Sequence, residues 1–111
     1  MFGRFGVSAV RDLTPEEVAR GVAAGDILLV DVREPAETAI ERIAGAVLVP
    51  LSRFDPADLP DPGGRALVFS CASGVRSVKA SEIAQAAGLP YDAHMAGGIK
   101  AWKAVGLPTE R

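Results

Sequence analysis

Short apolar runs recur along the chain without regular alternation between apolar and polar residues. They cover residues 27–32 (ILLVDV), 46–49 (AVLV) and 66–70 (ALVFS). Because a strand that helices cover on both faces is apolar throughout, these runs predict buried strands of a parallel sheet. A further short strand is predicted over about residues 91–95, ahead of a pair of glycines.

Segments of helical pattern separate the predicted strands. In LTPEEVARGVAAGD, Thr14 is the predicted N-cap, Pro15 the first helical residue and Glu17 the partner that completes a capping box, while Gly25 ends the helix. Further helices are predicted from residue 36, over residues 77–88 and from residue 97 to about residue 106.

The alternation of strands and helices predicts a single α/β domain over residues 1–111, with residues 1–6 as a candidate flexible N-terminal extension. We expect three layers, in which a parallel sheet of about five strands has helices on both faces and right-handed crossovers. In such sheets, ligands bind beyond the carboxyl ends of the strands. Residues 51–65, rich in proline and glycine, are predicted as a connector with one helical turn.

The alanine-rich helix over residues 77–88 should cover part of the sheet. Its apolar positions predicted to face the sheet are Val78, Ile83 and Ala86 or Ala87.

Size and composition are those of a globular domain with its own core, at 111 residues, 49% hydrophobic and 23% charged. The net charge is −2 and the basic residues are scattered, so no basic tract indicates a nucleic-acid partner. No run approaches the roughly 20 apolar residues that span a bilayer, and no signal-peptide pattern opens the chain. We therefore expect a cytoplasmic protein that binds neither nucleic acid nor membranes.

Cys71 is the only cysteine and His94 the only histidine. One cysteine cannot form an intramolecular disulfide, and this pair provides too few soft ligands for zinc unless carboxylates complete the site. We expect a reducing compartment, no metal and no cofactor. Residues 1–62 carry eleven acidic and six basic side chains, whereas residues 63–111 carry three acidic and six basic ones. The part that holds Cys71 is therefore positive, which favours an anionic substrate.

Six residues, Cys71 to Arg76, separate a predicted strand from a predicted helix in VFSCASGVRS. Backbone N–H groups of a loop that enters a helix N-terminus form a cradle for anions, and the helix dipole adds positive charge there. With Arg76 nearby, a cysteine in this cradle should have a pKa below the free value and act as a nucleophile. Gly74 supplies a position that tolerates a positive φ. The alternative is a buried cysteine that only fills space at a strand end.

The size of this loop indicates which group it holds. Four residues lie between Cys71 and Arg76, one fewer than in the phosphate loop of the cysteine phosphatases. The smaller ring of donors suits a single terminal sulfur on the cysteine better than a phosphate. A phosphatase or arsenate reductase is therefore the less favoured alternative.

Four stretches, in order, give the chain its resemblance to the rhodanese family in its single-domain form. They are LLVDVREPAE (28–37), RIAGAVLVP (42–50), VFSCASGVRS (68–77) and AGGIKAWKAVGLP (96–108), which together span nearly the whole domain. The sequence departs from the family at Arg42, where histidine is common. The resemblance implies the rhodanese fold and sulfur transfer.

By this resemblance, Cys71 is the catalytic nucleophile that takes the outer sulfur of thiosulfate or a similar small anionic donor and holds it as a persulfide. Cyanide, a cellular thiol or a protein then accepts the sulfur. The backbone N–H groups of Ala72, Ser73, Gly74, Val75 and Arg76 would stabilise the charged persulfide, and the Arg76 side chain would hold the donor. A non-catalytic alternative is a sulfur-carrier module that a partner protein loads.

Other polar residues are assigned supporting or structural roles. Asp31 and Arg33 lie at the end of a strand and are predicted to form an ion pair that fastens loops together and supports the site without a direct chemical role. Glu34 is predicted to be a solvated charge, and His94 to be structural or merely adjacent to the site. Lys100 and Lys103 are assigned to the solvated face of the last helix, and Trp102 to the core.

Overall fold

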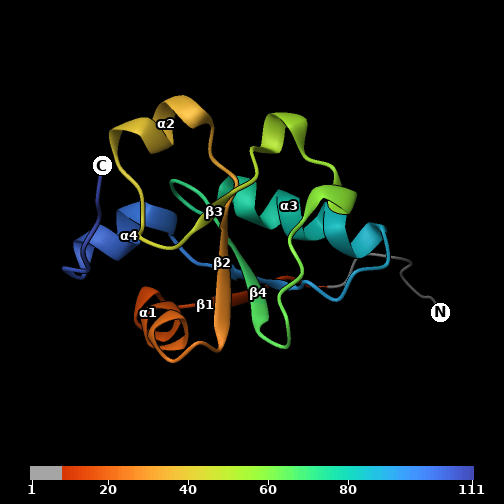
Figure 1. Cartoon of the computed structure of the whole chain (residues 1–111), viewed down its shortest axis with the longest axis horizontal. Helices are drawn as coiled ribbons and strands as arrows, with labels where there is room; N and C mark the ends of the chain where they lie inside the picture. The colour runs from red at the N-terminus through yellow and green to blue at the C-terminus, as the bar shows by residue number, and fades with distance from the viewer. Residues whose placement is uncertain (1–8) are drawn as a thin grey trace.

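The computed structural model describes residues 9–111, so the predicted extension over residues 1–6 lies outside the described part. The elements along the chain are β1 (Arg11–Leu13), α1 (Pro15–Ala23), β2 (Ile27–Asp31), α2 (Pro35–Ile40), β3 (Val47–Leu48), the 3-10 turns η1 (Leu51–Arg53) and η2 (Pro56–Asp58), β4 (Ala66–Ser70), α3 (Val75–Ala86), β5 (Ala93–Met95) and α4 (Gly98–Ala104). Strands and helices alternate, as the sequence predicts (Figure 1).

The five strands form one sheet in the order β1-β5-β4-β2-β3, and every pairing is parallel. The predicted α/β fold with a parallel sheet of about five strands is confirmed. The sequence did not predict β1, because it is only three residues long and its first two side chains are exposed. The strands predicted over 46–49 and 91–95 are shorter in the structure, at Val47–Leu48 and Ala93–Met95.

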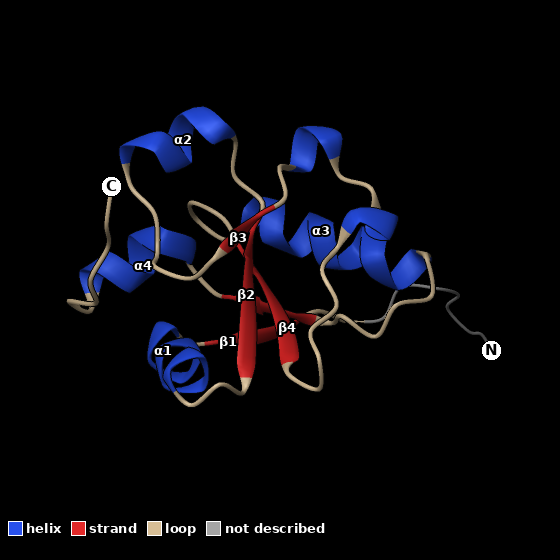
Figure 2. Ribbon diagram, in the orientation of Figure 1, coloured by secondary structure: helices blue, strands red, loops and turns tan. Residues whose placement is uncertain are grey.

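Helices cover both faces of the sheet (Figure 2). On one face, α1 and α4 pack through Val18, Ile99 and Trp102. On the other, α3 packs through Ala80 and Ala84 against a cluster that also contains Cys71. The other members of that second cluster are Leu28, Val30, Val32, Val49, Leu67 and Phe69. Alternate residues of β2 and β4 thus enter opposite cores, which explains why these strands are apolar without a gap.

The face that α3 turns to the sheet is not the predicted one. Its buried residues are Ser77, Ala80, Ser81 and Ala84, whereas Ala86 and Ala87 are exposed and Val78 and Ile83 are only half-buried. The prediction followed the largest apolar side chains. Small residues face the sheet instead. They include the fully buried serines Ser77 and Ser81, whose hydroxyl groups form hydrogen bonds with His94 and with the Tyr91 carbonyl oxygen.

Local signals in the sequence place α1 correctly. The Thr14 hydroxyl accepts from the Glu17 backbone N–H at 3.1 Å, and Glu17 Oε1 accepts from the Thr14 N–H at 2.8 Å, so the capping box is present. Gly25 has a positive φ of 77° at the end of the helix. The connector holds two 3-10 turns, η1 and η2, rather than one helical turn. Among the described residues, no helix is long and apolar enough to cross a membrane.

Candidate active site

Cys71 lies directly after β4, where the chain leaves the carboxyl edge of the sheet, and its side chain is buried. The Sγ atom accepts hydrogen bonds from the backbone N–H of Gly74 at 3.1 Å and of Ser77 at 3.3 Å. The Ser77 hydroxyl lies 3.4 Å from the same sulfur. The thiol therefore faces donors from the loop and from the first turn of α3, as expected for an anion cradle.

This environment lowers the pKa of Cys71. Burial raises the pKa of the thiol, but hydrogen bonds from the Ser77 hydroxyl and from the backbone N–H groups of Ser77, Gly74 and Ser73 outweigh that effect. Each of these donors stabilises the thiolate more than the thiol. The net result is a thiol whose pKa lies below its ordinary value.

Two glycines, one in the cysteine loop and one at the start of α4, allow the loop and α4 to pack closely together. Gly74, the N-cap of α3, has a φ of 98°, and Gly98, the first residue of α4, has a φ of 60°. A Cβ atom on Gly98 would lie 2.4 Å from the Cys71 carbonyl oxygen, so only glycine allows the two backbones to approach. The first N–H groups of α4 then bond the loop: Ile99 donates to Cys71 O at 2.9 Å and Lys100 to Ala72 O at 3.1 Å.

Arg76 lies in the first turn of α3, and α2 holds its guanidinium. Nη1 donates to Glu37 Oε1 at 2.6 Å and Nη2 to Glu37 Oε2 at 2.9 Å. The hydrogen bond from Arg76 is the main reason that the pKa of Glu37 falls from 4.5 to about 2. The same pair raises the pKa of Arg76 above its ordinary value. Arg76 is therefore a fixed cation, five residues after Cys71, whose orientation α2 determines.

Asp31 and Arg33 form the predicted ion pair. Both side chains are buried, and Arg33 Nη2 lies 2.8 Å from Asp31 Oδ2. The same Nη2 donates to the carbonyl oxygen of Glu41, just after α2, at 2.9 Å. Their hydrogen bonds go to each other and to Glu41 rather than to Cys71, and together they fasten α2, which presents Glu37 to Arg76.

Ser77 links the thiol to His94 and then to β1. Ser77 Oγ lies 2.8 Å from His94 Nδ1, and His94 Nε2 lies 2.7 Å from Asp12 Oδ1. The strand pairing brings these residues together, because β5 lies between β4 and β1 and aligns Asp12 with His94. His94 is buried, whereas the side chain of Asp12 is largely exposed. His94 therefore lies two hydrogen bonds from the sulfur.

Of the remaining loop residues, Ser73 directs its backbone N–H at the sulfur, and Ala72 accepts through its carbonyl oxygen from Lys100. Ser73 and Val75 are exposed, and Ala72 and Gly74 are half-buried. Val75 turns its apolar side chain to solvent with 74% of its surface accessible. Lys100 is also exposed, and its backbone, rather than its ammonium group, contacts the loop.

Several polar residues near the site have structural partners. The Glu34 carboxylate accepts from the Ser52 hydroxyl at 2.6 Å, a contact that the sequence did not predict. Lys103 pairs with Glu41 at 2.8 Å on the surface, and the Trp102 indole, buried as predicted, donates to Pro108 O at 2.8 Å. Arg42 pairs with Glu110 at 3.2 Å and so holds the C-terminal segment.

Sequence reasoning missed three residues that the structure connects to the site: Glu37, Ser77 and Asp12. Ser77 could have been found, since it follows Arg76 and continues the helix entry that holds the sulfur. Glu37 and Asp12 come from distant elements, and only the arrangement of α2 and β1 reveals them. Across the described residues, no cluster of histidine, cysteine and carboxylate side chains could hold a metal ion.

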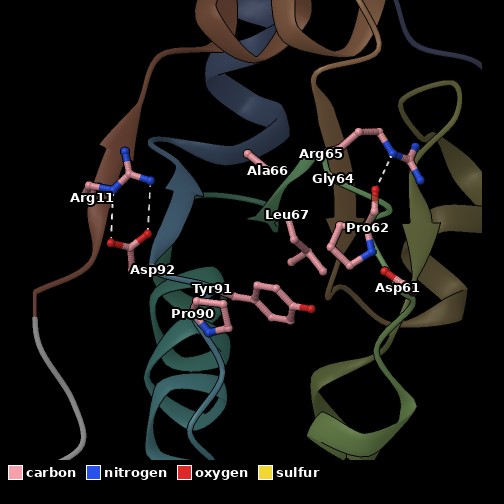
Figure 3. A pocket seen from close by; sticks show the side chains of 10 residues that line it. All are labelled: Arg11, Asp61, Pro62, Gly64, Arg65, Ala66, Leu67, Pro90, Tyr91 and Asp92. Atoms are coloured by element: carbon pink, nitrogen blue, oxygen red, sulfur yellow. Dashed lines mark hydrogen bonds and ion pairs between the residues drawn. The ribbon is translucent and has the colours of Figure 1, made fainter.

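A separate pocket lies at the amino ends of the strands, at the start of β4 and before β5 (Figure 3). Tyr91 and Leu67 line it, as do Arg11 and Asp92, which form an ion pair. None of its lining residues belongs to the cysteine loop, so this pocket is not part of the candidate site.

Comparisons with known proteins agree with this geometry. The family model named rhodanese-like domain matches residues 14–105. An uncharacterized protein, slr1261, from Synechocystis sp. is 45% identical over 83 residues, which cover 75% of this chain and 46% of that protein. The chain thus spans less than half the length of this relative.

A protein named sulfurtransferase from Allochromatium vinosum is 34% identical over 100 residues, covering 89% of this chain and 94% of that protein. The crystal structure of a rhodanese-related protein from Thermoplasma volcanium superposes with a TM-score of 0.76 at 27% identity. The match covers 90% of this chain and 97% of that one.

Proposed function

The chain belongs to the rhodanese-like domain family, and we propose that it is a sulfurtransferase that carries sulfur as a persulfide on Cys71. One observation carries the proposal: a buried sulfur that accepts hydrogen bonds from two backbone N–H groups and whose pKa is lowered. A thiolate in this position is a ready nucleophile, and the same donors would stabilise the charged persulfide that follows. The Allochromatium relative, named sulfurtransferase, supports this reading.

Transfer takes place in two half-reactions. The Cys71 thiolate attacks the outer sulfur of thiosulfate, a bond forms between the two sulfurs, and sulfite leaves with the electrons of the broken sulfur–sulfur bond. A thiolate or cyanide then attacks the outer sulfur of the persulfide, and Cys71 leaves as a thiolate. This covalent mechanism predicts ping-pong kinetics.

Arg76 is the candidate group for holding the anionic donor. Its guanidinium is a fixed cation near the helix N-terminus, and the bidentate bond to Glu37 leaves other N–H groups for a ligand. The backbone N–H groups of residues 72–76 and of Ser77 complete the cradle. Thiosulfate combines negative charge with a transferable sulfur, so it is the donor class that this site suits best.

Intact-mass measurement tests the proposal directly. After incubation with thiosulfate, the full chain should gain the mass of one sulfur atom, and cyanide should remove it. The Cys71→Ser variant should gain nothing. The Ser73→Ala variant serves as a control, because it removes only an exposed hydroxyl and keeps the backbone N–H that faces the sulfur. An unchanged mass across thiosulfate, mercaptopyruvate and low-molecular-weight persulfide donors would refute sulfur transfer.

A sulfur-carrier module that a partner protein loads is the second candidate. The exposed apolar side chain of Val75, with 74% of its surface accessible, favours it, because this side chain offers a docking protein an apolar contact on the cysteine loop. A carrier would gain sulfur from a protein persulfide but turn over thiosulfate and cyanide poorly. Phosphoryl transfer is disfavoured by the short loop and would be revived by aryl phosphate hydrolysis that disappears in Cys71→Ser.

A further inference from the structure

A continuous line of hydrogen-bonding groups runs from the buried sulfur to the surface. It passes from Cys71 Sγ to Ser77 Oγ at 3.4 Å, to His94 Nδ1 at 2.8 Å, and from His94 Nε2 to Asp12 Oδ1 at 2.7 Å. Ser77 is fully buried and His94 is 4% exposed, whereas the Asp12 side chain is 73% exposed. The thiol end of the line is therefore buried, and the carboxylate end is exposed to solvent.

The chemistry of Asp12 fixes the direction of these hydrogen bonds. A carboxylate only accepts, so His94 must carry a hydrogen on Nε2 and donate it to Asp12. In the neutral ring, Nδ1 is then an acceptor and receives the Ser77 hydroxyl hydrogen. The serine oxygen in turn accepts from the Cys71 thiol. Within this line, each side-chain donor thus points away from the sulfur and toward the Asp12 carboxylate.

We propose that Ser77, His94 and Asp12 form a proton relay that removes the proton from Cys71. The thiol gives its proton to Ser77 Oγ as Ser77 gives its own to His94 Nδ1, so one proton leaves the sulfur and one arrives on the ring. The products are a Cys71 thiolate and a His94 imidazolium that Asp12 holds, and the Ser77 hydroxyl now donates to the sulfur. No electrons or other reactants are needed.

A second buried serine on the same helix shows what a purely structural contact looks like. Ser81 lies one turn after Ser77 on the same face of α3, and its hydroxyl donates to the Tyr91 carbonyl oxygen at 2.7 Å. That contact ends on the backbone and cannot store a proton. Ser77 instead contacts a nucleophile on one side and a titratable ring on the other, which is the arrangement that general-base activation requires.

Few other charged groups lie near the relay among residues 9–111. Asp12 on β1 is the charged group that bonds the ring. From α3, Arg76 precedes Ser77, and Glu37 holds its guanidinium. Gly74 lies against His94 and against the Gly97 backbone, and Phe69, the neighbour on β4, carries no charge. Ser77 is the member of the relay that contacts the sulfur. His94 and Asp12 act on the sulfur through Ser77 and are positioning residues in this sense.

The relay deepens the proposed function, since it supplies the thiolate that attacks the sulfur donor. It is tested without any donor by following the ultraviolet absorbance of the Cys71 thiolate against pH in the full chain. Asp12→Asn keeps a neutral acceptor for Nε2 but removes the charge that stabilises the imidazolium. We expect the titration to move to higher pH, with a loss of about tenfold in thiolate at neutral pH for a shift of one unit.

The sign of this shift separates the relay from simple electrostatics. Removing the negative charge of Asp12 would by itself favour the thiolate and move the titration to lower pH. A lower midpoint, or an unchanged one, in Asp12→Asn would overturn the relay. Because the Asp12 side chain is mostly exposed, this substitution does not threaten folding.

Two further variants complete the test. His94→Asn retains an oxygen that can accept from Ser77 but cannot store a proton, so the thiolate titration should again move to higher pH. Ser81→Ala should leave the titration where it is, and an equal shift in Ser81→Ala would show that any buried change in α3 has this effect. If the variants shift the thiolate titration as expected but the wild-type chain takes up no sulfur from any donor, the sulfurtransferase is refuted and the relay is not.

Discussion

Arg76 of α3 and Glu37 of α2 form a bidentate ion pair, with N–O distances of 2.6 and 2.9 Å. The pair joins α3, which begins at the cysteine loop, to α2. Arg33 holds α2 in place through its hydrogen bond to the carbonyl oxygen of Glu41. The orientation of the candidate donor-binding cation is thus set by a residue 39 positions earlier in the chain.

Replacement of Arg76 by alanine should weaken donor binding more than sulfur release. Loss of a charge-assisted hydrogen bond, worth roughly 1.5–3 kcal/mol, should raise the thiosulfate concentration for half-maximal loading by about tenfold or more. The rate at which cyanide removes the sulfur should change much less. Lys79→Ala, which removes an exposed cation one turn further along α3, is the matched control. Equal effects on both half-reactions would argue against a donor-binding role.

Acid should remove the stability that the Glu37 pair provides. The pKa of Glu37 is lowered from 4.5 to about 2, so its contribution is fully present above pH 4.5 and disappears as the pH falls toward 2. Because both side chains are about one-third exposed, we expect the pair to contribute only about 1 kcal/mol to the free energy of unfolding. Urea unfolding of wild type and Glu37→Gln should give a difference at pH 7 that vanishes near pH 2. A difference that persists at low pH would contradict this linkage.

Substitution of Gly98 by alanine should destabilise the fold and disturb the cysteine loop. Its φ is positive and the new Cβ would lie 2.4 Å from the Cys71 carbonyl oxygen, so the two backbones must separate. We expect a loss of about 3 kcal/mol in the free energy of unfolding, with faster alkylation of Cys71.

Gly88→Ala provides the comparison for this prediction. Gly88 also has a positive φ, but its Cβ would meet nothing within 4 Å. Only the backbone strain of about 1–2 kcal/mol should appear, with unchanged alkylation. If both variants lose the same stability, the close approach of α4 to the loop is not what requires glycine.

The buried pair of Asp31 and Arg33 should matter far more for stability than a surface pair of the same residue types. Asp31→Asn leaves a buried guanidinium without its counter-charge and should cost about 3–5 kcal/mol. Asp92→Asn removes the partner of exposed Arg11 and should cost no more than about 1 kcal/mol. Thermal unfolding of the two variants checks the contrast, and similar losses would show that burial does not decide the value of the pair.

Much of the fold could be predicted from the sequence because its signals are local. The apolar runs of β2 and β4 and the capping box at Thr14 each depend on neighbouring residues. The position of β1 could not be predicted, because three residues with two exposed side chains carry no pattern of their own. The same holds for the inward face of α3, where small serines and alanines replace the larger apolar residues that hydrophobicity favours.

The sequence by itself determined the cysteine loop: a strand end, a lone thiol, a glycine able to adopt positive φ and a helix start follow one another within ten residues. The tertiary structure alone decided which side chains surround that thiol. Glu37 reaches Arg76 only after α2 folds over the strand ends, and Asp12 meets His94 only because β1 adds to the sheet beside β5. Residues that are close in the sequence can be assigned to a loop from the sequence alone. Contacts between distant segments depend on how the helices pack and on the order of the strands in the sheet.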